Sequence, residues 1–319
     1  MSDNLKEIRT NIKRRQLINK IFAIIALLTI FVALIILLGL TLQLIIQGAP
    51  RLSVEFLTSF PSRKPEQAGI LSAWVGTSLV MLVTALAAVP LGVAAGIYLE
   101  EYARKNWIAD IIEINVTNLA GVPSIVYGLL ALGLFVYQFK LGESIQTAGL
   151  TLALLILPIV IVTTREAIRA IPNSLREAAY ALGATKWQTI WDHVLPSAFG
   201  TILTGIIVGL SRAIGETAPV ITIGALTFIA FLPDSPFNAE FPFIPFTSNF
   251  PWINFEQLFA WLRAPFTLMP IQMFNWVSRP NPEFQLNAAA AGTVLLIMTL
   301  MMNGIAIYLR FLFRRGVKW

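Results

Sequence analysis

The chain has 319 residues, of which 56% are hydrophobic and 13% charged, and its formal net charge is +6. Soluble domains carry about 25% charged residues, so this composition excludes an ordinary soluble protein and predicts an all-α polytopic membrane protein. The basic residues flank apolar runs and form no separate basic domain, so the positive charge does not indicate binding to nucleic acid. The absence of cysteine excludes a disulfide framework and a thiolate metal site.

The N-terminal region predicts a first membrane span. Residues 1–20 are polar and basic, whereas residues 21–50 carry no charge. This run is longer than the core of a signal peptide, which is about 7–15 residues, and it ends without a small-residue cleavage site. We therefore expect an uncleaved span over 21–50 that lies at the periphery of the bundle.

The second span is predicted over residues 67–99, which are uncharged and contain Pro90, a residue expected to kink the helix. The mixed segment 51–66 before it is expected to form an outer loop. Acidic residues at 100–101 stand four residues before basic residues at 104–105, in the order that favours ion pairs along a helix. We therefore expect the helix to continue past the membrane surface, or a short surface helix to follow it.

Two further apolar runs predict the third and fourth spans. The third falls within 114–139, where Ala120, Ser124 and Gly128 recur at the four-residue spacing that permits close helix packing in lipid. The fourth covers the uncharged residues 144–164.

The C-terminal part of the chain predicts two more spans around an unusual outer segment. The fifth span begins at Pro196 and contains Gly205 and Gly209, a GxxxG pair. Residues 231–286 are rich in proline and aromatic residues, which predicts a structured outer segment lying partly among the lipid headgroups. The sixth span is predicted over 284–309.

The distribution of basic residues predicts the orientation of these six spans. Of the 23 lysines and arginines, 16 fall on one proposed side, 6 on the other, and Arg212 lies inside a span. Because the cytoplasmic side carries the excess of basic residues, both termini and the segment between spans four and five are expected in the cytoplasm.

That cytoplasmic segment has the pattern of a helical hairpin. Apolar residues recur at helical spacing on both sides of Gly183, which interrupts the pattern as a helix C-terminal glycine does. The apolar positions are Leu175, Ala178, Ala179 and Leu182 before the glycine and Trp187, Ile190, Trp191 and Val194 after it. An apolar stripe needs a partner, either the chain's own surface or a groove on another protein. The pattern alone is also compatible with a short amphipathic linker.

The stretch EAAYALGATKWQTIWDHVLP, residues 177–196, resembles the EAA loop of the bacterial ABC importer permeases. That loop has E-A-A, three residues, G, nine residues, an apolar residue, any residue, and L-P. Glu177, Ala178, Ala179, Gly183, Leu195 and Pro196 match, whereas His193 stands where the family has an aliphatic residue. The stretches GIYLEEYA, NLAGVPSIVYG, SLREAAYALGATKW, RAIGETAP and NWVSRP are similar to the phosphate-specific permeases of this family.

The resemblance, which covers roughly residues 70 to 310, implies the type I ABC importer permease fold in the inner membrane of a prokaryote. It implies a single transmembrane domain over 1–319, with the permease core at 67–309 and the EAA loop at 170–196. The implied partners are a second homologous permease, a pair of ATPase subunits, an external phosphate-binding protein and membrane lipid. No P-loop motif occurs in the chain, so ATP and Mg are expected at the partner ATPase, with no cofactor or metal held by this chain.

The resemblance also implies that the EAA loop couples this subunit to the ATPase. The candidate coupling residues are Glu177, Ala178, Ala179, Gly183, Trp187, Trp191, Leu195 and Pro196. Glu177 is expected to hydrogen-bond or ion-pair across the interface, the two alanines to allow close approach, and Gly183 to form the turn. The two tryptophans are large aromatic surfaces of the kind that anchor interfaces.

Arg212 and Glu216 form the second candidate site, because an ionisable residue in an apolar span is costly and often functional. Four residues apart, they are expected to share a helix face. They are either a structural ion pair or part of the path of an anion, since the planar guanidinium suits phosphate oxygens. In the second case Glu216 accepts a hydrogen bond from protonated phosphate, or holds Arg212 while the path is empty.

Two rival functions remain open from the sequence. The nearer is a permease for another oxyanion, molybdate or sulfate, although these anions lack the protonated oxygen that Glu216 could recognise. The farther is a membrane-embedded enzyme, for which Arg212 and Glu216 alone are a poor catalytic set. The polar span residues Asn118, Ser124, Asn287 and Asn303 either line a path or, more commonly, link helices.

Overall fold

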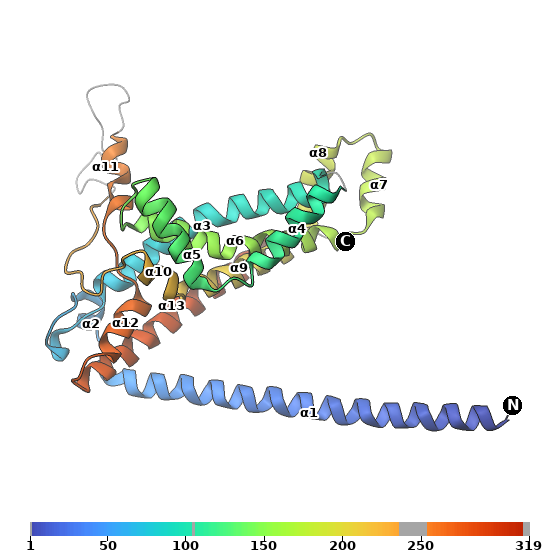
Figure 1. Cartoon of the computed structure of the whole chain (residues 1–319), viewed down its shortest axis with the longest axis horizontal. Helices are drawn as coiled ribbons and strands as arrows, with labels where there is room; N and C mark the ends of the chain where they lie inside the picture. The colour runs from blue at the N-terminus through green and yellow to red at the C-terminus, as the bar shows by residue number, and fades with distance from the viewer. Residues whose placement is uncertain (1, 104–105, 236–253, 315–319) are drawn as a thin grey trace.

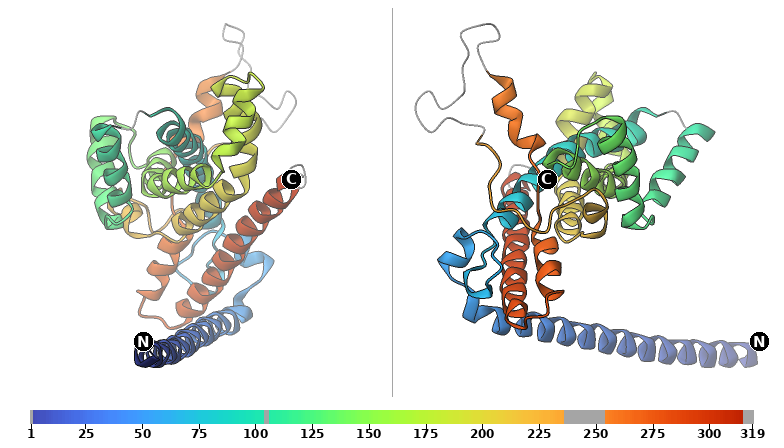
Figure 2. Two further views of the ribbon diagram at one scale, coloured as in Figure 1. Left: turned by 90° about the vertical axis from the view of Figure 1, so that its right-hand side faces the viewer. Right: turned by 60° about the vertical axis from the view of Figure 1, so that its left-hand side comes forward.

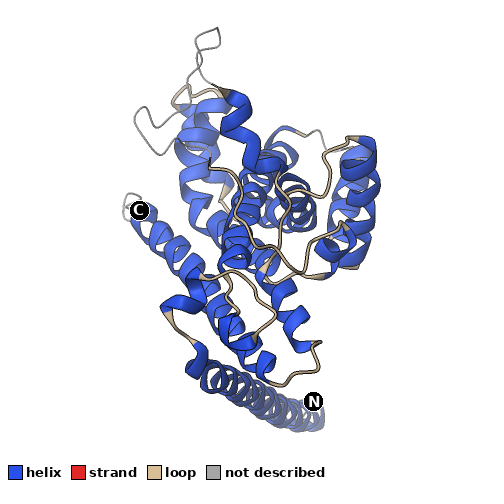
Figure 3. Ribbon diagram, turned by 90° about the vertical axis from the view of Figure 1, so that its left-hand side faces the viewer, coloured by secondary structure: helices blue, strands red, loops and turns tan. Residues whose placement is uncertain are grey.

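The computed structural model describes residues 2–103, 106–235 and 254–314, and within these ranges every regular element is a helix (Figures 1 and 3). Five helices are long and apolar enough to cross a membrane, and a bent pair brings the number to six. The five are α1 (Ser2–Gly48), α3 (Leu71–Ile97), α6 (Ile145–Arg169), α9 (Leu195–Ile214) and α13 (Glu283–Arg314). The prediction of an all-α protein with about six spans is therefore confirmed.

Helix α1 lies along the outside of the bundle and diverges from it toward its N-terminal end (Figure 2). None of the residues in its most apolar window is buried. Its C-terminal end is attached to α13, where a Cβ added to Gly48 would come within 2.7 Å of the backbone nitrogen of Ala290. A helix satisfies its own backbone hydrogen bonds, so lipid can surround the rest of α1.

Helix α6 lies at the centre of the bundle, between α3 and α9. Small residues permit the close approach: a Cβ on Gly96 of α3 would lie 2.7 Å from Cβ of Thr164, and one on Gly205 of α9 would collide with Thr163. Thr84 of α3 adds a hydrogen bond to the Gly149 carbonyl of α6, at 3.2 Å. Without a hydrophobic driving force between helices in lipid, such packing and hydrogen bonding stabilise the bundle.

The prediction of one continuous third span over 114–139 is wrong. The structure has α4 (Trp107–Leu119) and then α5 (Ser124–Ala131) with its π-helical extension η4 (Leu132–Gln138), bent by 106° at the break. The cause is Pro123, which lacks an N–H and disfavours helical geometry in the residue before it.

The break also changes the role expected for Ala120, Ser124 and Gly128. Ala120 falls in the turn rather than on α5, so these residues do not form one small-residue stripe. Gly128 packs instead against α10 (Ala218–Thr222), where a Cβ would come within 2.6 Å of the Pro219 carbonyl oxygen.

Several short helices gather at the end of the bundle opposite the chain termini (Figure 1). They are η1 (Ala49–Arg51), α2 (Val54–Thr58), η2 (Pro65–Gln67), α11 (Phe255–Phe259), η6 (Ala260–Arg263) and α12 (Met269–Val277). Trp276 is fully buried, 6.0 Å from Phe56 between ring centroids, so it packs the core rather than lying at the headgroups. The central part of the predicted outer segment, 236–253, lies outside the described residues.

Two polar side chains hold this outer end together. Arg51 donates from Nε to Oδ1 of Asn287, at 2.9 Å, and from Nη2 to the carbonyls of Pro65, Glu66 and Ala68. Arg279 donates to Oδ1 of Asn275 and lies over the Phe284 ring, and its burial lowers the pKa of its guanidinium. Asn287 therefore links helix α13 to the outer loop.

Candidate functional site

The first arm of the hairpin is α7 (Asn173–Ala181), which ends in a turn that requires glycine. Gly183 has φ +84°, a conformation that is strained for residues with a Cβ. Its N–H donates to the Tyr180 carbonyl at 2.9 Å, and the N–H of Ala184 donates to the Ala179 carbonyl at 3.1 Å. These two bonds form a Schellman motif, which caps the open carbonyls at the helix end.

The second arm begins at a capping box. The Thr185 hydroxyl accepts from the N–H of Gln188, and the Gln188 side chain accepts in return from the N–H of Thr185. The helix then runs through α8 (Lys186–Gln188) and the π-helical turn η5 (Thr189–Val194) directly into α9.

The fifth span therefore does not begin at Pro196, as the sequence predicted, but continues the second arm of the hairpin. The π-helical turn ends at Val194, two residues before this proline, which has no N–H to close an α-helical bond. One continuous helical run therefore carries both the second arm and the span.

The two faces of the hairpin differ sharply in exposure. Ala179, Ile190 and Val194 are buried, at no more than 4% exposure. Leu182, Trp187 and Trp191 are 89%, 61% and 47% exposed. Of the other candidate coupling residues, Glu177, Ala178, Gly183 and Pro196 are exposed and Leu195 is half-buried.

The apolar stripe of the hairpin is therefore divided between the chain's own surface and a free side. Ala179 packs inside the hairpin, where α7 meets η5, so of the two alanines Ala178 alone lies on the free side. Trp187 and Trp191 contact each other, with ring centroids 5.2 Å apart and an interplanar angle of 50°. Like Leu182, they are left exposed by the described part of the chain, and we call these three apolar side chains the docking face.

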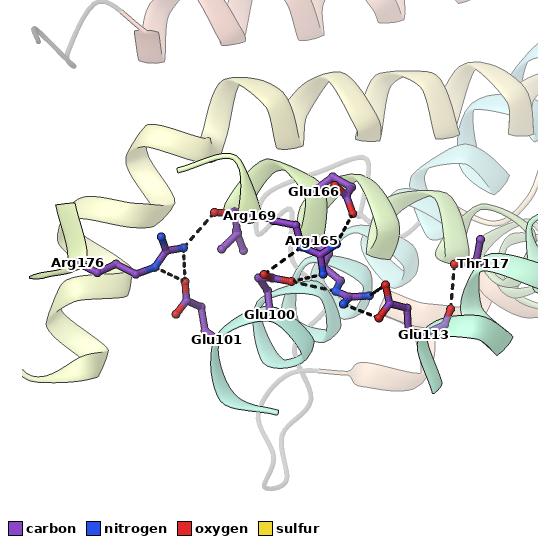
Figure 4. A network of polar contacts seen from close by, with 9 residues as sticks. Glu100, Glu101, Glu113, Thr117, Arg165, Glu166, Arg169 and Arg176 are labelled. Atoms are coloured by element: carbon purple, nitrogen blue, oxygen red, sulfur yellow. Dashed lines mark hydrogen bonds and ion pairs between the residues drawn. The ribbon is translucent and has the colours of Figure 1, made fainter. Parts of the chain in front are cut away.

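A network of ion pairs anchors the hairpin to the bundle (Figure 4). Arg176 of α7 contacts Glu101 with Nη2–Oε1 2.7 Å, and Arg165 of α6 contacts both Glu100 and Glu113. These side chains border a polar cleft of about 550 Å³ between α4, α6, α7 and η3 (Tyr98–Tyr102), the π-helical extension of α3.

Sequence reasoning missed this network, because it paired the acidic residues 100–101 with the basic residues 104–105 along one helix. Residues 104–105 lie outside the described residues. The two carboxylates instead bond arginines about 65 to 75 positions later in the chain. Only the tertiary arrangement of α3, α6 and α7 brings them together.

Arg212 and Glu216 lie at the opposite end of α9 from the hairpin. Their Nε and Oε1 atoms are 3.4 Å apart, and their side chains are 43% and 21% exposed. Helix α9 ends at Ile214, so Glu216 lies beyond it. The prediction that the two residues share one helix face is therefore wrong. Among the described residues, Glu216 is the one side chain that hydrogen-bonds Arg212.

Most donors of Arg212 have no partner among the residues that the structure describes. Its contact with Glu216 is single and long, whereas a bidentate pair would occupy two donor groups. Arg212 also interacts electrostatically with Tyr127 on α5. The next residue, Gly128, packs against α10, the short helix that follows Glu216. The guanidinium of Arg212 is thus partly exposed, with donors that no described side chain occupies.

Among the remaining polar span residues, Asn303 links two of the spanning helices. Asn303 of α13 accepts a 2.6 Å hydrogen bond from Ser211 of α9. His193 is exposed, and its carbonyl accepts from Ser197 one turn later. In the described part of the chain, no three His, Asp or Glu side chains are grouped in a way that could hold a metal ion.

Comparison with solved structures shows the fold. The permease chain of the MetNI methionine ABC transporter, in an inward-facing conformation, superposes with a TM-score of 0.55 at 15% identity, covering 76% of this chain and 95% of that chain.

Comparison with curated sequences finds related permeases. "Phosphate transport system permease protein PstA" of Yersinia pestis is 31% identical over 90% of this chain and 88% of its own length, and PstA of Pasteurella multocida is 30% identical over 92% and 95%. "Probable ABC transporter permease protein YqgH" of Bacillus subtilis is 38% identical over 58% of this chain, and the chain spans 62% of that relative's length.

The family described as "Binding-protein-dependent transport system inner membrane component" matches residues 88–318, most of the chain. Such a permease is a multi-pass protein of the inner membrane and works with a binding protein and ATPase subunits. The chain belongs to this family of binding-protein-dependent ABC importer permeases.

Proposed function

We propose that this chain is a permease subunit of an importer of inorganic phosphate and forms the translocation path with a second, homologous permease. The observation that carries the choice of substrate is the similarity to PstA proteins over about nine-tenths of the chain. The relatives from Bacillus subtilis extend the similarity to permeases whose names give no substrate.

Coupling to ATP hydrolysis takes place at the docking face. Leu182, Trp187 and Trp191 are exposed apolar side chains on a hairpin at the same end of the molecule as both chain termini (Figure 1). Large aromatic residues anchor interfaces when a partner covers them. A pair of ATPase subunits binds ATP and Mg and receives this face in a groove, and the chain itself needs no cofactor.

The continuity of the second arm with α9 gives this docking a mechanical consequence. When ATP closes the paired ATPases, the two hairpins of the permease pair move, and each carries its α9 with it. The far end of α9 bears Arg212. Movement of the hairpin therefore reaches the charged pair through a single helix, and the pair of permeases opens outward to receive phosphate from the external binding protein.

Arg212 and Glu216 contribute to the path of the anion. The long contact between them leaves guanidinium donors that can bind phosphate oxygens. Phosphate near neutral pH keeps a protonated oxygen, so Glu216 can accept a hydrogen bond from it while Arg212 supplies the positive charge. Sulfate and molybdate lack that proton and would place an unprotonated oxygen against the carboxylate.

The test is uptake into liposomes that contain this subunit with its second permease, the ATPase pair and the binding protein. Labelled phosphate, sulfate and molybdate are supplied outside at equal concentration, with ATP enclosed at the ATPase side. We expect phosphate to accumulate and the other two anions to stay near the level without ATP. Accumulation of sulfate or molybdate in preference to phosphate would refute the choice of substrate.

A further inference from the structure

The π-helical turn η3, at the end of α3, is held by both arms of the hairpin. From the first arm, Arg176 donates from Nη2 and Nε to Oε1 of Glu101, at 2.7 and 3.0 Å. From the second arm, the Lys186 ammonium donates to the Glu101 backbone carbonyl and lies 4.9 Å from the centre of the Tyr102 ring. Two basic residues ten positions apart therefore meet on one turn of another helix.

The contact between Arg176 and Glu101 is the most enclosed ion pair in the described part of the chain, with side chains 15% and 8% exposed. By contrast, Arg169 and Glu166 form a pair within α6 that is 45% and 58% exposed. Exposed pairs on one helix contribute little, whereas breaking an enclosed pair leaves a desolvated charge without compensation.

Arg176 also closes the end of α6. Its Nη1 donates to the Ile171 carbonyl at 2.8 Å, and its Nη2 donates to the Ile168 carbonyl at 3.1 Å. The last carbonyls of a helix have no partner inside the helix. One guanidinium on α7 therefore joins the ends of α6 and α3 to the hairpin, a task for which the rigid fork of arginine is better suited than lysine.

The neighbouring carboxylate, Glu100, connects the same turn to other helices. Glu100 accepts from Arg165 and Arg169 of α6, and Arg165 continues to Glu113 of α4, with Nη2–Oε2 2.7 Å (Figure 4). Glu101 thus ties η3 to the hairpin, and Glu100 ties it to α6 and, through Arg165, to α4.

We propose that Arg176 and Glu101 are positioning residues that make the hairpin and the cytoplasmic end of α3 move as one body. A displacement of the hairpin is passed to α3 through this pair and then to α6 and α4 through Glu100. The inference rests on the proposed docking of the ATPase at the hairpin, because docking supplies the displacement. It adds a second route to the direct continuity of the hairpin with α9.

The first test measures the mechanical link without using transport. The chain has no cysteine, so Ser174→Cys on the hairpin, outside the docking face, and Leu86→Cys on α3, both exposed, give a spin-labelled pair in an otherwise unmodified protein. In the assembled complex we expect a narrow distance distribution that broadens in Glu101→Gln and broadens less in Arg176→Lys. Glu166→Gln, which changes the exposed pair within α6, is the matched control and should leave the distribution unchanged.

The second test measures coupling in the reconstituted complex, as labelled phosphate taken up per ATP hydrolysed. Loss of the negative charge from this contact should lower the ratio in Glu101→Gln by about tenfold. ATPase co-purification should be retained, and Arg176→Lys should be intermediate. An unchanged ratio together with an unchanged spin-label distribution would overturn the proposal. If the hairpin is not where the ATPase docks, the result would differ. ATPase binding would then survive disruption of the Gly183 turn, while the distance distribution would still broaden in Glu101→Gln.

Discussion

Replacing Gly183 tests whether the shape of the hairpin turn is needed for ATPase binding. Gly183 has φ +84°, and nothing lies within 4 Å of the position that a Cβ would occupy, so an added methyl group changes backbone strain without a clash. An L-residue in this left-handed conformation costs about 1–2 kcal/mol. That cost disfavours the native turn by a factor of about 5 to 30, and the affinity for the ATPase should fall by the same factor in Gly183→Ala.

Gly183→Pro should abolish binding, because proline fixes φ near −65° and removes the N–H that donates to the Tyr180 carbonyl. The assay is titration of the purified permease pair with the ATPase, read as a dissociation constant. Gly142 provides the matched control: it has φ +69°, is exposed, and has no neighbour within 4 Å of a Cβ, but it lies before α6 at the other end of the bundle. Gly142→Ala should leave ATPase affinity unchanged, and equal affinities for wild type and Gly183→Pro would refute the reasoning.

Three further substitutions test other parts of the account. Changing both hairpin tryptophans to alanine should reduce the binding free energy of the ATPase by about 2 kcal/mol or more per anchor residue. The loss should be visible as weaker co-purification, and undiminished co-purification would show that the tryptophans are not anchors. The double variant Arg212→Gln, Glu216→Gln should assemble normally and fail to take up phosphate, since neutral side chains offer no charge to the anion; uptake near wild type would leave the pair as a structural one. Gly205→Leu should lower the unfolding free energy by about 1–3 kcal/mol through collision with α6, whereas Gly304→Leu, with open space around it, should not change thermal stability measurably.

The sequence predicted most of the spans, because an apolar run of sufficient length leaves the backbone no alternative to a helix in lipid. It failed where a local break competes with such a run. Gly121, Val122 and Pro123 stand inside an uncharged stretch that was interpreted as one span, and the structure bends there by 106°. The proline was a visible signal for the break, but the packing of α5 against α10 joins residues far apart in the sequence and could not be predicted from it.

The hairpin shows the same division between local and tertiary information. Gly183 and the amphipathic spacing indicated two arms and a turn, since these depend on residues close in sequence. The burial of Ala179 depends on how α7 packs against η5. The ion pair of Glu101 depends on how α7 lies against η3. No pattern along a single helix specifies contacts of this kind, so the anchoring network became visible only in the structure.

The most direct test of the central claim, that the docking face is where the ATPase binds, is photo-crosslinking from Leu182. This side chain is 89% exposed, and Leu182→Cys can be modified at a single site because the chain has no other cysteine. A thiol-linked photoreactive group at this position in the assembled complex should form an adduct with the ATPase subunit, whereas the same group on Leu86→Cys in α3 should react with lipid or with the second permease. Adducts from Leu182→Cys that contain no ATPase would contradict the account.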